Sequence, residues 1–126
     1  MQKTLSAKQK GDIGELHARI DLVEKGYTIL LPDTNYADFD FVAYRDGNFK
    51  RVQCKYRSVN KDGRIRVKSE KMERIEVDWY SIYVPDIDCL FYIDIKSVPT
   101  KDVAFYPLRA YEYCYLVNHT GSLWSV

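Results

Sequence analysis

Little in this 126-residue chain points to a secreted, zinc-binding or membrane protein. Its three cysteines lie far apart, without the pattern of a disulfide framework and without histidines at zinc-ligand spacing. No apolar run approaches the roughly 18 residues that a membrane span needs, and the polar first residues lack the apolar stretch of a secretory signal. We therefore expect a cytoplasmic protein with reduced thiols and no membrane partner.

Residues that divide a chain into segments are also scarce. Four prolines and six glycines are spread along the sequence, with no repeat, no low-complexity stretch and no linker. The hydrophobic content of 46% is enough to bury one core in a chain of this length. We expect residues 1–126 to form a single domain.

Net charge is nearly absent as well, at +1, but the charges are unevenly distributed. Residues 50–71 contain nine basic and two acidic residues, so the rest of the chain is acidic. A basic segment on an acidic body is typical of proteins that bind a nucleic-acid backbone. A solvated charged hairpin would have the same composition and is the simpler alternative. The candidate nucleic-acid contacts are Arg51, Arg57, Lys61, Arg64, Arg66 and Lys68.

Residues 5–25 have the periodicity of one long helix, followed by Gly26 at a position typical of helix ends. One apolar stripe of this helix consists of Ile13, Leu16, Ile20 and Val23. A second stripe is small and apolar except for one carboxylate, and consists of Gly11, Glu15, Ala18 and Leu22. The second face can press closely on a sheet, so we expect Glu15 to point into a site.

The chain after the helix is rich in strand-forming residues separated by turn signals. The expected strands are residues 27–31, 39–45, 49–57, 64–68, 79–84 and 89–95. Residues 108–117 are aromatic-rich and fit either a helix or a strand. A helix followed mainly by strands indicates an α+β or α/β domain.

A hairpin is predicted where Asp46-Gly47 joins two of these strands. A two-residue loop at this dipeptide places Asp40 opposite Gln53, and a shift of the loop by one residue places Asp40 opposite Lys55. In both registers the three side chains share one face, because side chains alternate along a strand. The opposite, core-facing side then carries Val52, Cys54 and Tyr56.

The polar residues of this hairpin are suited to phosphodiester chemistry. Hydrolysis of a phosphodiester needs a metal to polarise a phosphoryl oxygen and to acidify the attacking water. Mg²⁺ prefers oxygen ligands and keeps several waters around one or two carboxylates; Mn²⁺ is a natural substitute. Lys55 can stabilise charge on the phosphate or orient the attacking water. The expected metal ligands are the Asp40 carboxylate, the Gln53 side-chain oxygen, the Cys54 backbone carbonyl and Glu15.

Two of these assignments have alternatives. Glu15 could be an exposed residue paired with Arg19 one turn later, a contact worth about 0.3 kcal/mol. Asp38 lies two residues before Asp40 and shares its face, so it is a second candidate for the metal ligand.

The order of these residues resembles the PD-(D/E)XK nuclease superfamily. The matching positions are Gly11-x-x-Gly14-Glu15, then Asp40, then Gln53-x-Lys55. The resemblance is closer to a small branch that includes a cyanobacterial group I intron homing endonuclease, since that branch also has glutamine in the triplet. Residues 78–85, 91–93 and 108–109 are similar to the same branch. One departure is Phe39, which stands where the family motif has proline.

The resemblance implies a restriction-endonuclease-like core, in which helices flank a mixed central sheet. It also implies that Asp40 and Gln53 bind the metal, that Glu15 supports them, and that Lys55 is catalytic. The implied activity is Mg²⁺-dependent cleavage of double-stranded DNA, with the site specificity of a homing endonuclease. A small subunit has one site and a duplex break needs two cuts, so we expect a homodimer or homotetramer.

Three other functions remain open at the level of the sequence. A Holliday-junction resolvase of the same fold would act on branched DNA with equally small subunits. A catalytically weak module of the same fold would bind DNA without cutting it, and an RNA-processing enzyme would have a similar composition.

Overall fold

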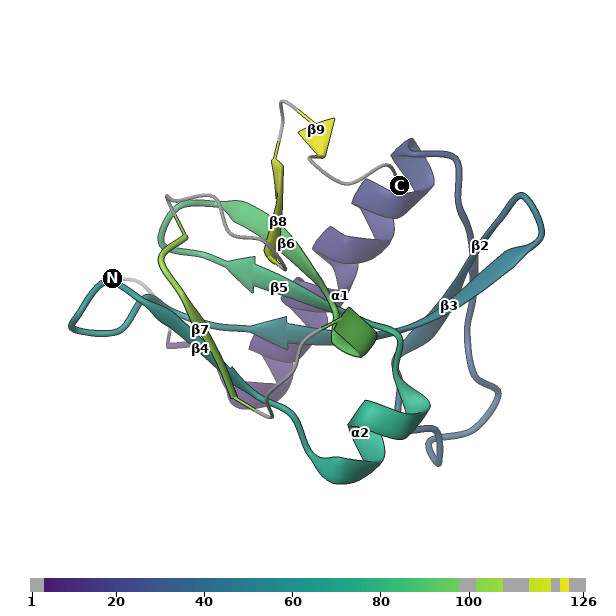
Figure 1. The fold of residues 1–126 in the computed structure, drawn as a ribbon, viewed down its shortest axis with the longest axis horizontal. Helices are drawn as coiled ribbons and strands as arrows, with labels where there is room; N and C mark the ends of the chain where they lie inside the picture. Colours follow the sequence, from purple (N-terminus) through teal and green to yellow (C-terminus); the bar gives the residue numbers. More distant parts are fainter. Residues whose placement is uncertain (1–3, 98–101, 108–113, 119–120, 123–126) are drawn as a thin grey trace.

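The computed structural model describes residues 4–97, 102–107, 114–118 and 121–122 (Figure 1). Its helices are α1 (Ala7–Glu24) and α2 (Lys71–Glu76), with a short 3₁₀ turn, η1 (Ile95–Ser97). The strands are β1 (Thr28–Leu30), β2 (Phe41–Arg45), β3 (Asn48–Tyr56), β4 (Ile65–Lys68), β5 (Trp79–Val84), β6 (Cys89–Asp94), β7 (Asp102–Phe105), β8 (Cys114–Asn118) and β9 (Gly121–Ser122).

The central sheet has seven strands in the order β1-β2-β3-β5-β6-β8-β9. Its strands pair antiparallel except β3 and β5, which are parallel. Parallel neighbours need a crossover connection, and here β4 and α2 lie within it. The predicted mixed sheet is therefore confirmed.

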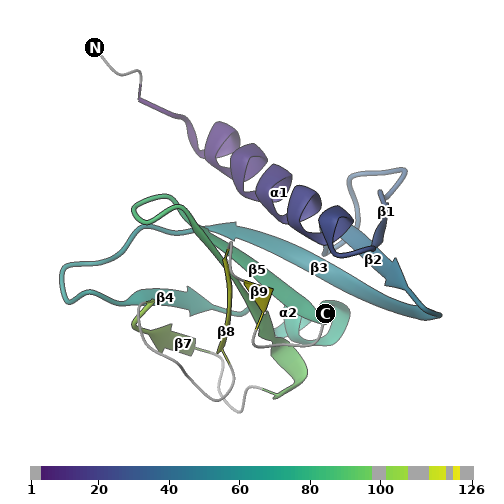
Figure 2. The ribbon, with the colours of Figure 1, turned by 90° about the horizontal axis from the view of Figure 1, so that it is seen from above.

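The sheet is covered on both faces (Figure 2). Helix α1 lies across one face, and the separate two-stranded sheet β4-β7 lies on the other, on the same side as α2. The expected helices on the faces of the sheet are therefore confirmed. A small second sheet covers part of the second face as well, because β4 has buried Ile65 and Val67 alternating with exposed residues, a pattern that suits a strand packed on a core.

Two apolar clusters hold these layers together. Between α1 and the sheet, the largest fully buried side chains are Leu22, Phe41 and Tyr92. Between the sheet and β4-β7, Phe91 and Phe105 pack with ring centroids 5.2 Å apart. The core-facing side predicted for β3 is confirmed, since its members contact the α1 cluster, namely Val52, Cys54 and Tyr56.

Helix α1 begins with a capping box, because Ser6 and Gln9 exchange side-chain and backbone hydrogen bonds of 3.1 and 2.8 Å. It ends before Gly26, whose φ of +91° suits the left-handed position after a helix. Of its two stripes, the small one faces the sheet, with Ala18 and Leu22 fully buried.

The close approach of α1 to the sheet is made by Gly14 and not by Gly11. A Cβ at Gly14 would lie 3.4 Å from the carbonyl oxygen of Lys55, whereas one at Gly11 would have no neighbour within 4 Å. The apolar stripe on the other face remains between 52% and 58% exposed at Leu16, Ile20 and Val23.

The hairpin between β2 and β3 has the predicted two-residue turn. Asp46 and Gly47 have φ values of +52° and +83°, which match the type I′ turn favoured by Asp-Gly. Phe41 pairs with Val52, so the first of the two registers is confirmed. Strand β2 begins at Phe41, two residues later than predicted, and Asp40 lies just outside the ladder.

Four of the described elements were not expected from the sequence, namely α2, η1, β7 and β9. Helix α2 has six residues, none of them buried, so it lacks the apolar periodicity that identifies a longer helix. Of the segment left open as helix or strand, residues 114–117 belong to β8, while residues 108–113 lie outside the described residues. Within the described residues, neither helix has the length and apolar character required to cross a membrane.

The contact at Gly14 gives a paired test in one helix. Replacing Gly14 with Leu inserts a side chain between α1 and β3, so we expect the free energy of unfolding to fall by about 1–3 kcal/mol. The same change at Gly11 meets no neighbour and should raise the free energy of unfolding by roughly 0.5–1 kcal/mol through helix propensity. Urea unfolding of both variants measures this difference, and equal effects would contradict the close approach.

Candidate active site

Asp40 lies where β2 and β3 separate. Its backbone N–H donates to the carbonyl of Val52 at 2.8 Å, beside the first pair of the ladder. Its carboxylate Oδ2 then accepts a hydrogen bond of 2.7 Å from the backbone N–H of Cys54. Phe39 precedes Asp40 and would extend β2 along β3. It instead packs against the apolar cluster between the central sheet and β4-β7. The Asp40 side chain thus replaces the backbone partner that β2 no longer supplies.

The neighbouring groups of β3 follow from this geometry. The carbonyl and N–H of a strand residue point to the same neighbouring strand, so the Cys54 carbonyl lies on the Asp40 side of β3. Gln53 and Lys55 pair with Tyr80 and Ile82 of β5. Their side chains alternate with that of Cys54 and therefore extend on the face that α2 covers.

Glu15 reaches the same edge of β3 from α1. Because Gly14 brings the helix against the backbone of Lys55, the next residue is half-buried close to Asp40. Burial, followed by the charge of Asp40, raises the pKa of Glu15. Arg19 offsets part of this effect through an ion pair of 3.4 Å. Glu15 thus pairs with Arg19 and also approaches Asp40, and its role at a metal site stays a prediction.

The electrostatics of the site disfavour its own negative charges. Burial raises the pKa of Asp40, and the hydrogen bonds from Cys54 and the charge of Lys55 oppose this only in part. Burial also raises the pKa of the Cys54 thiol well above its ordinary value, so this cysteine is a neutral side chain. Two partly desolvated carboxylates at one edge would be stabilised by a bound cation.

Lys55 has a partner that was not predicted. Its Nζ lies 3.0 Å from Oε2 of Glu73 on α2, and both side chains are only 15% exposed. The same ammonium lies 5.0 Å from the centre of the Tyr80 ring. Glu73 was missed because it belongs to the unexpected short helix. The one local signal was the Glu70-x-x-Glu73 spacing, in which Glu73 accepts the Glu70 N–H at 3.1 Å.

The oxygen donors at this edge fit a hard divalent cation. Within the described ranges, no three His, Cys, Asp or Glu side chains form a metal-binding group. A cation would therefore depend on the Asp40 carboxylate together with the Gln53 amide oxygen, the Cys54 carbonyl, Glu15 and water. Mg²⁺ tolerates such a set, because it usually keeps several waters around one or two carboxylates.

Asp38, the alternative metal ligand, lies outside the edge of β3 that Asp40 occupies. Asp38 is exposed, within the bend that precedes β2, whereas Asp40 is half-buried and bound to β3. This difference favours Asp40, but the choice between them stays a prediction.

The predicted DNA contacts fall into two groups. Arg51 is held by Asp78 at 3.0 Å and by Glu76 at 3.4 Å, and Arg64 forms an ion pair with Asp62. Arg57 donates to the Tyr56 carbonyl at 3.0 Å. The remaining three are exposed, Lys61, Arg66 and Lys68. All six stay predictions as DNA contacts.

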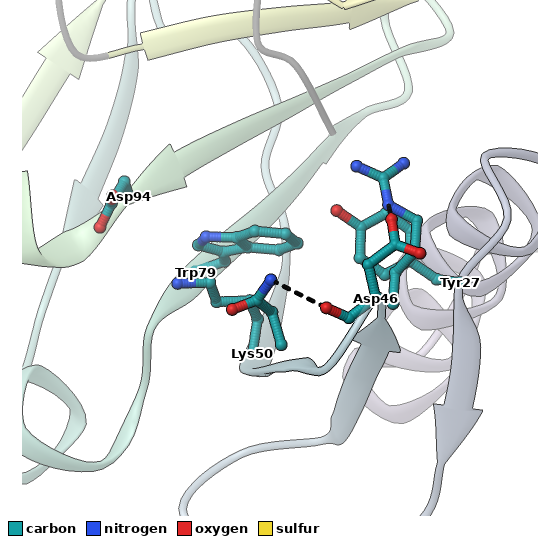
Figure 3. Close-up of a pocket in the computed structure, with 7 residues that line it drawn as sticks. Tyr27, Asp46, Lys50, Trp79 and Asp94 are labelled. Carbon is teal, nitrogen blue, oxygen red and sulfur yellow. Dashed lines mark hydrogen bonds and ion pairs between the residues drawn. The ribbon is translucent and has the colours of Figure 1, made fainter.

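A separate pocket lies beside the hairpin turn (Figure 3), and Asp40 is not among the residues that line it. Figure 3 shows Lys50 next to Trp79, with the ammonium 6.0 Å from the ring centre. Arg45 lies 4.5 Å over the Tyr27 ring on the opposite wall. The two basic residues of this pocket are balanced by Asp46 and Asp94, so it lacks the excess positive charge of a phosphate site.

Comparison with known families decides the classification. A family model described as PD-(D/E)XK endonuclease matches residues 5–111. The chain belongs to the PD-(D/E)XK endonuclease family. The resemblance seen in the sequence is thereby confirmed, and this PD-(D/E)XK protein is a nuclease.

Solved structures agree with this fold. The bacterial homing endonuclease I-Ssp6803I superposes on the nuclease with a TM-score of 0.71 and 20% identity, over 86% of this chain and 81% of that one. The Holliday junction resolvase Hjc of the archaeon Archaeoglobus fulgidus superposes with a TM-score of 0.56 and 14% identity, over 79% of this chain and 88% of that one. Among curated protein sequences, none matches the nuclease.

The raised pKa of Asp40 gives a stability test. At pH 7 without metal, Asp40→Asn should raise Tm, because it removes a charge that burial disfavours while its amide oxygen still accepts from Cys54. Because the pKa of Asp40 is raised in the folded protein, ionisation of Asp40 lowers stability as pH rises through this pKa. At lower pH Asp40 is neutral, so the Tm values of the wild type and Asp40→Asn should become equal. Thermal melts in a chelator at several pH values measure this.

The same melts with Mg²⁺ test the ligand assignment. Mg²⁺ should raise the Tm of the wild-type protein and should not raise the Tm of Asp40→Asn. At a Mg²⁺ concentration one hundred times its Kd, the added stability of the wild type should be about 2.7 kcal/mol. Asp38→Asn is the matched control and should keep the full Mg²⁺ effect. Loss of the effect in Asp38→Asn alone would make Asp38 the ligand.

Proposed function

We propose that this nuclease is a Mg²⁺-dependent endonuclease that hydrolyses phosphodiester bonds in double-stranded DNA at specific sites. The observation that carries the proposal is the Asp40 carboxylate bound to the Cys54 N–H at the open edge of β3. Glu15 and Lys55 are both within electrostatic range of this carboxylate. A carboxylate pair and an ammonium at one edge are suited to a metal and a phosphate.

Each group has a distinct role in this proposal. Asp40, Gln53 and the Cys54 carbonyl bind the cation, and Glu15 binds it directly or through water. A divalent ion held there would supply Lewis acidity toward a phosphoryl oxygen and toward a water molecule. Lys55 donates hydrogen bonds to the phosphate and stabilises the negative charge that develops on it.

DNA as the substrate is supported by charge and by the two similar structures. Arg66 and Lys68 are exposed on β4, and Lys61 is exposed in the loop before it. Contacts of this kind bind phosphates without reading bases. A homing endonuclease and a junction resolvase, by their names, both act on DNA.

A second copy of the chain completes the proposed function. Each chain has one Asp40 edge, and a duplex break requires a cut in each strand. A homodimer or homotetramer with closed symmetry would present two such sites.

Loss of Lys55 tests catalysis directly. Lys55→Met and Asp40→Asn should each reduce the single-turnover cleavage rate with Mg²⁺ by on the order of 10²–10³, the size of an electrostatic contribution to catalysis. DNA affinity in a chelator should be unchanged. Lys68→Ala is a control that should weaken binding and lower the salt dependence without changing the cleavage rate. Unchanged cleavage in Lys55→Met would refute its role, and binding without any cleavage by the wild type would identify a non-catalytic module.

The structural similarity to Hjc keeps junction resolution as a second candidate. The wild-type protein with Mg²⁺ should be incubated with a linear duplex library, supercoiled plasmid, a four-way junction and an RNA of the same sequence. Discrete cuts in linear duplex DNA are expected for the proposed function. Strong preference for the four-way junction would favour a resolvase, and preference for RNA would contradict DNA as the substrate.

A further inference from the structure

Glu73 is held in place from two sides. Its Oε1 accepts the backbone N–H of Glu70, which ties it to the beginning of α2, and its Oε2 binds the Lys55 ammonium at 3.0 Å. The helix therefore sets the position of the ammonium. Lys55 itself has a long side chain with many rotamers, so a second anchor is needed to fix its charged end.

The position of this ammonium matters for Asp40. Lys55 is close enough to lower the pKa of Asp40 through its charge, yet its hydrogen bond goes to Glu73. Without Glu73, the ammonium would be free to approach Asp40, a carboxylate that its charge already reaches. A lysine bound to Asp40 would neutralise the ligand that a cation needs.

The surroundings of the pair argue against a purely stabilising role. Burying two charges costs desolvation energy that their attraction often fails to recover, so a buried ion pair is weak support for stability. Tyr80 lies beside this pair with 3% exposure, and burial together with the charge of Glu73 raises the pKa of its hydroxyl. The desolvation cost of this ion pair is more readily explained if the pair serves to place the Lys55 ammonium.

We propose that Glu73 is a positioning residue, which holds the Lys55 ammonium away from Asp40 and toward the scissile phosphate. This inference rests on the proposed nuclease function and adds a residue from outside the family motif. Glu73 does not touch the substrate in this scheme; it acts through Lys55.

Steady-state cleavage with Mg²⁺ tests the inference, because a positioning residue should affect kcat without affecting KM. Glu73→Gln should lower kcat by about tenfold, a coupling typical of contacting residues, with KM for DNA unchanged. Glu76→Gln is the matched control, because Glu76 is on the same helix and also pairs with a basic residue of β3, Arg51, at 3.4 Å. It changes net charge equally and should leave kcat unchanged. Equal effects of the two variants would overturn the inference.

A metal titration tests the same idea without activity. Free Mn²⁺ measured by electron paramagnetic resonance should show that Glu73→Gln weakens Mn²⁺ binding by about tenfold, because Lys55 then occupies Asp40. In a Lys55→Met background the same change should have no more effect than Glu76→Gln. An equal loss in both backgrounds would show that Glu73 acts on the cation directly, and no loss in either would show that it does not control Lys55; both overturn the inference.

The two experiments separate this inference from the proposed function. If the wild-type protein cuts no DNA, the nuclease proposal fails, while the Mn²⁺ titration still decides the role of Glu73. If the wild type cuts and Glu73→Gln cuts with the same kcat, only the role of Glu73 is refuted.

Discussion

The hydrogen bond from the Cys54 N–H to the Asp40 carboxylate is the contact on which the candidate site depends. Strand β3 continues past the end of its ladder with β2, and its backbone needs a partner there because a buried N–H without one is costly. A side chain supplies that partner in place of another backbone. The segment that precedes Asp40 can then leave the ladder, and the edge of β3 stays open for a ligand.

The other parts of the site are placed by packing against the same strand. Gly14 lets α1 touch the backbone of Lys55, and this contact determines how near Glu15 comes to Asp40. On the opposite face, the crossover from β3 to β5 carries α2 and brings Glu73 to Lys55. Acidic groups thus approach β3 from both faces, and each is partly shielded from water. The repulsion between Glu15 and Asp40 is the physical reason that a cation would bind.

How much the sequence predicts depends on how local the responsible contact is. The hairpin follows from Asp46-Gly47, and the alternation of β3 places Asp40 and Gln53 on one face in either register. The choice between the two registers came only from the structure. The periodic pattern places Gly11 on the stripe that faces the sheet, whereas in the structure Gly14 lies against β3 and Gly11 is exposed. Glu73 could not be predicted, since its partner Lys55 lies in another element and a six-residue helix has no apolar repeat.

The glutamine at position 53 and the glutamate at position 73 are best understood together. A lysine beside two carboxylates forms its ion pair with the carboxylate that offers the better geometry. The paired carboxylate then binds a cation less well. An acid at position 53 would compete with Glu73 for Lys55 at short range, whereas an amide offers a neutral oxygen. With Gln53, Lys55 retains Glu73 as a partly buried acidic partner at hydrogen-bond distance, and Asp40 stays available to a cation. A neutral oxygen at position 53 is thus compatible with a lysine whose ion pair is made with Glu73.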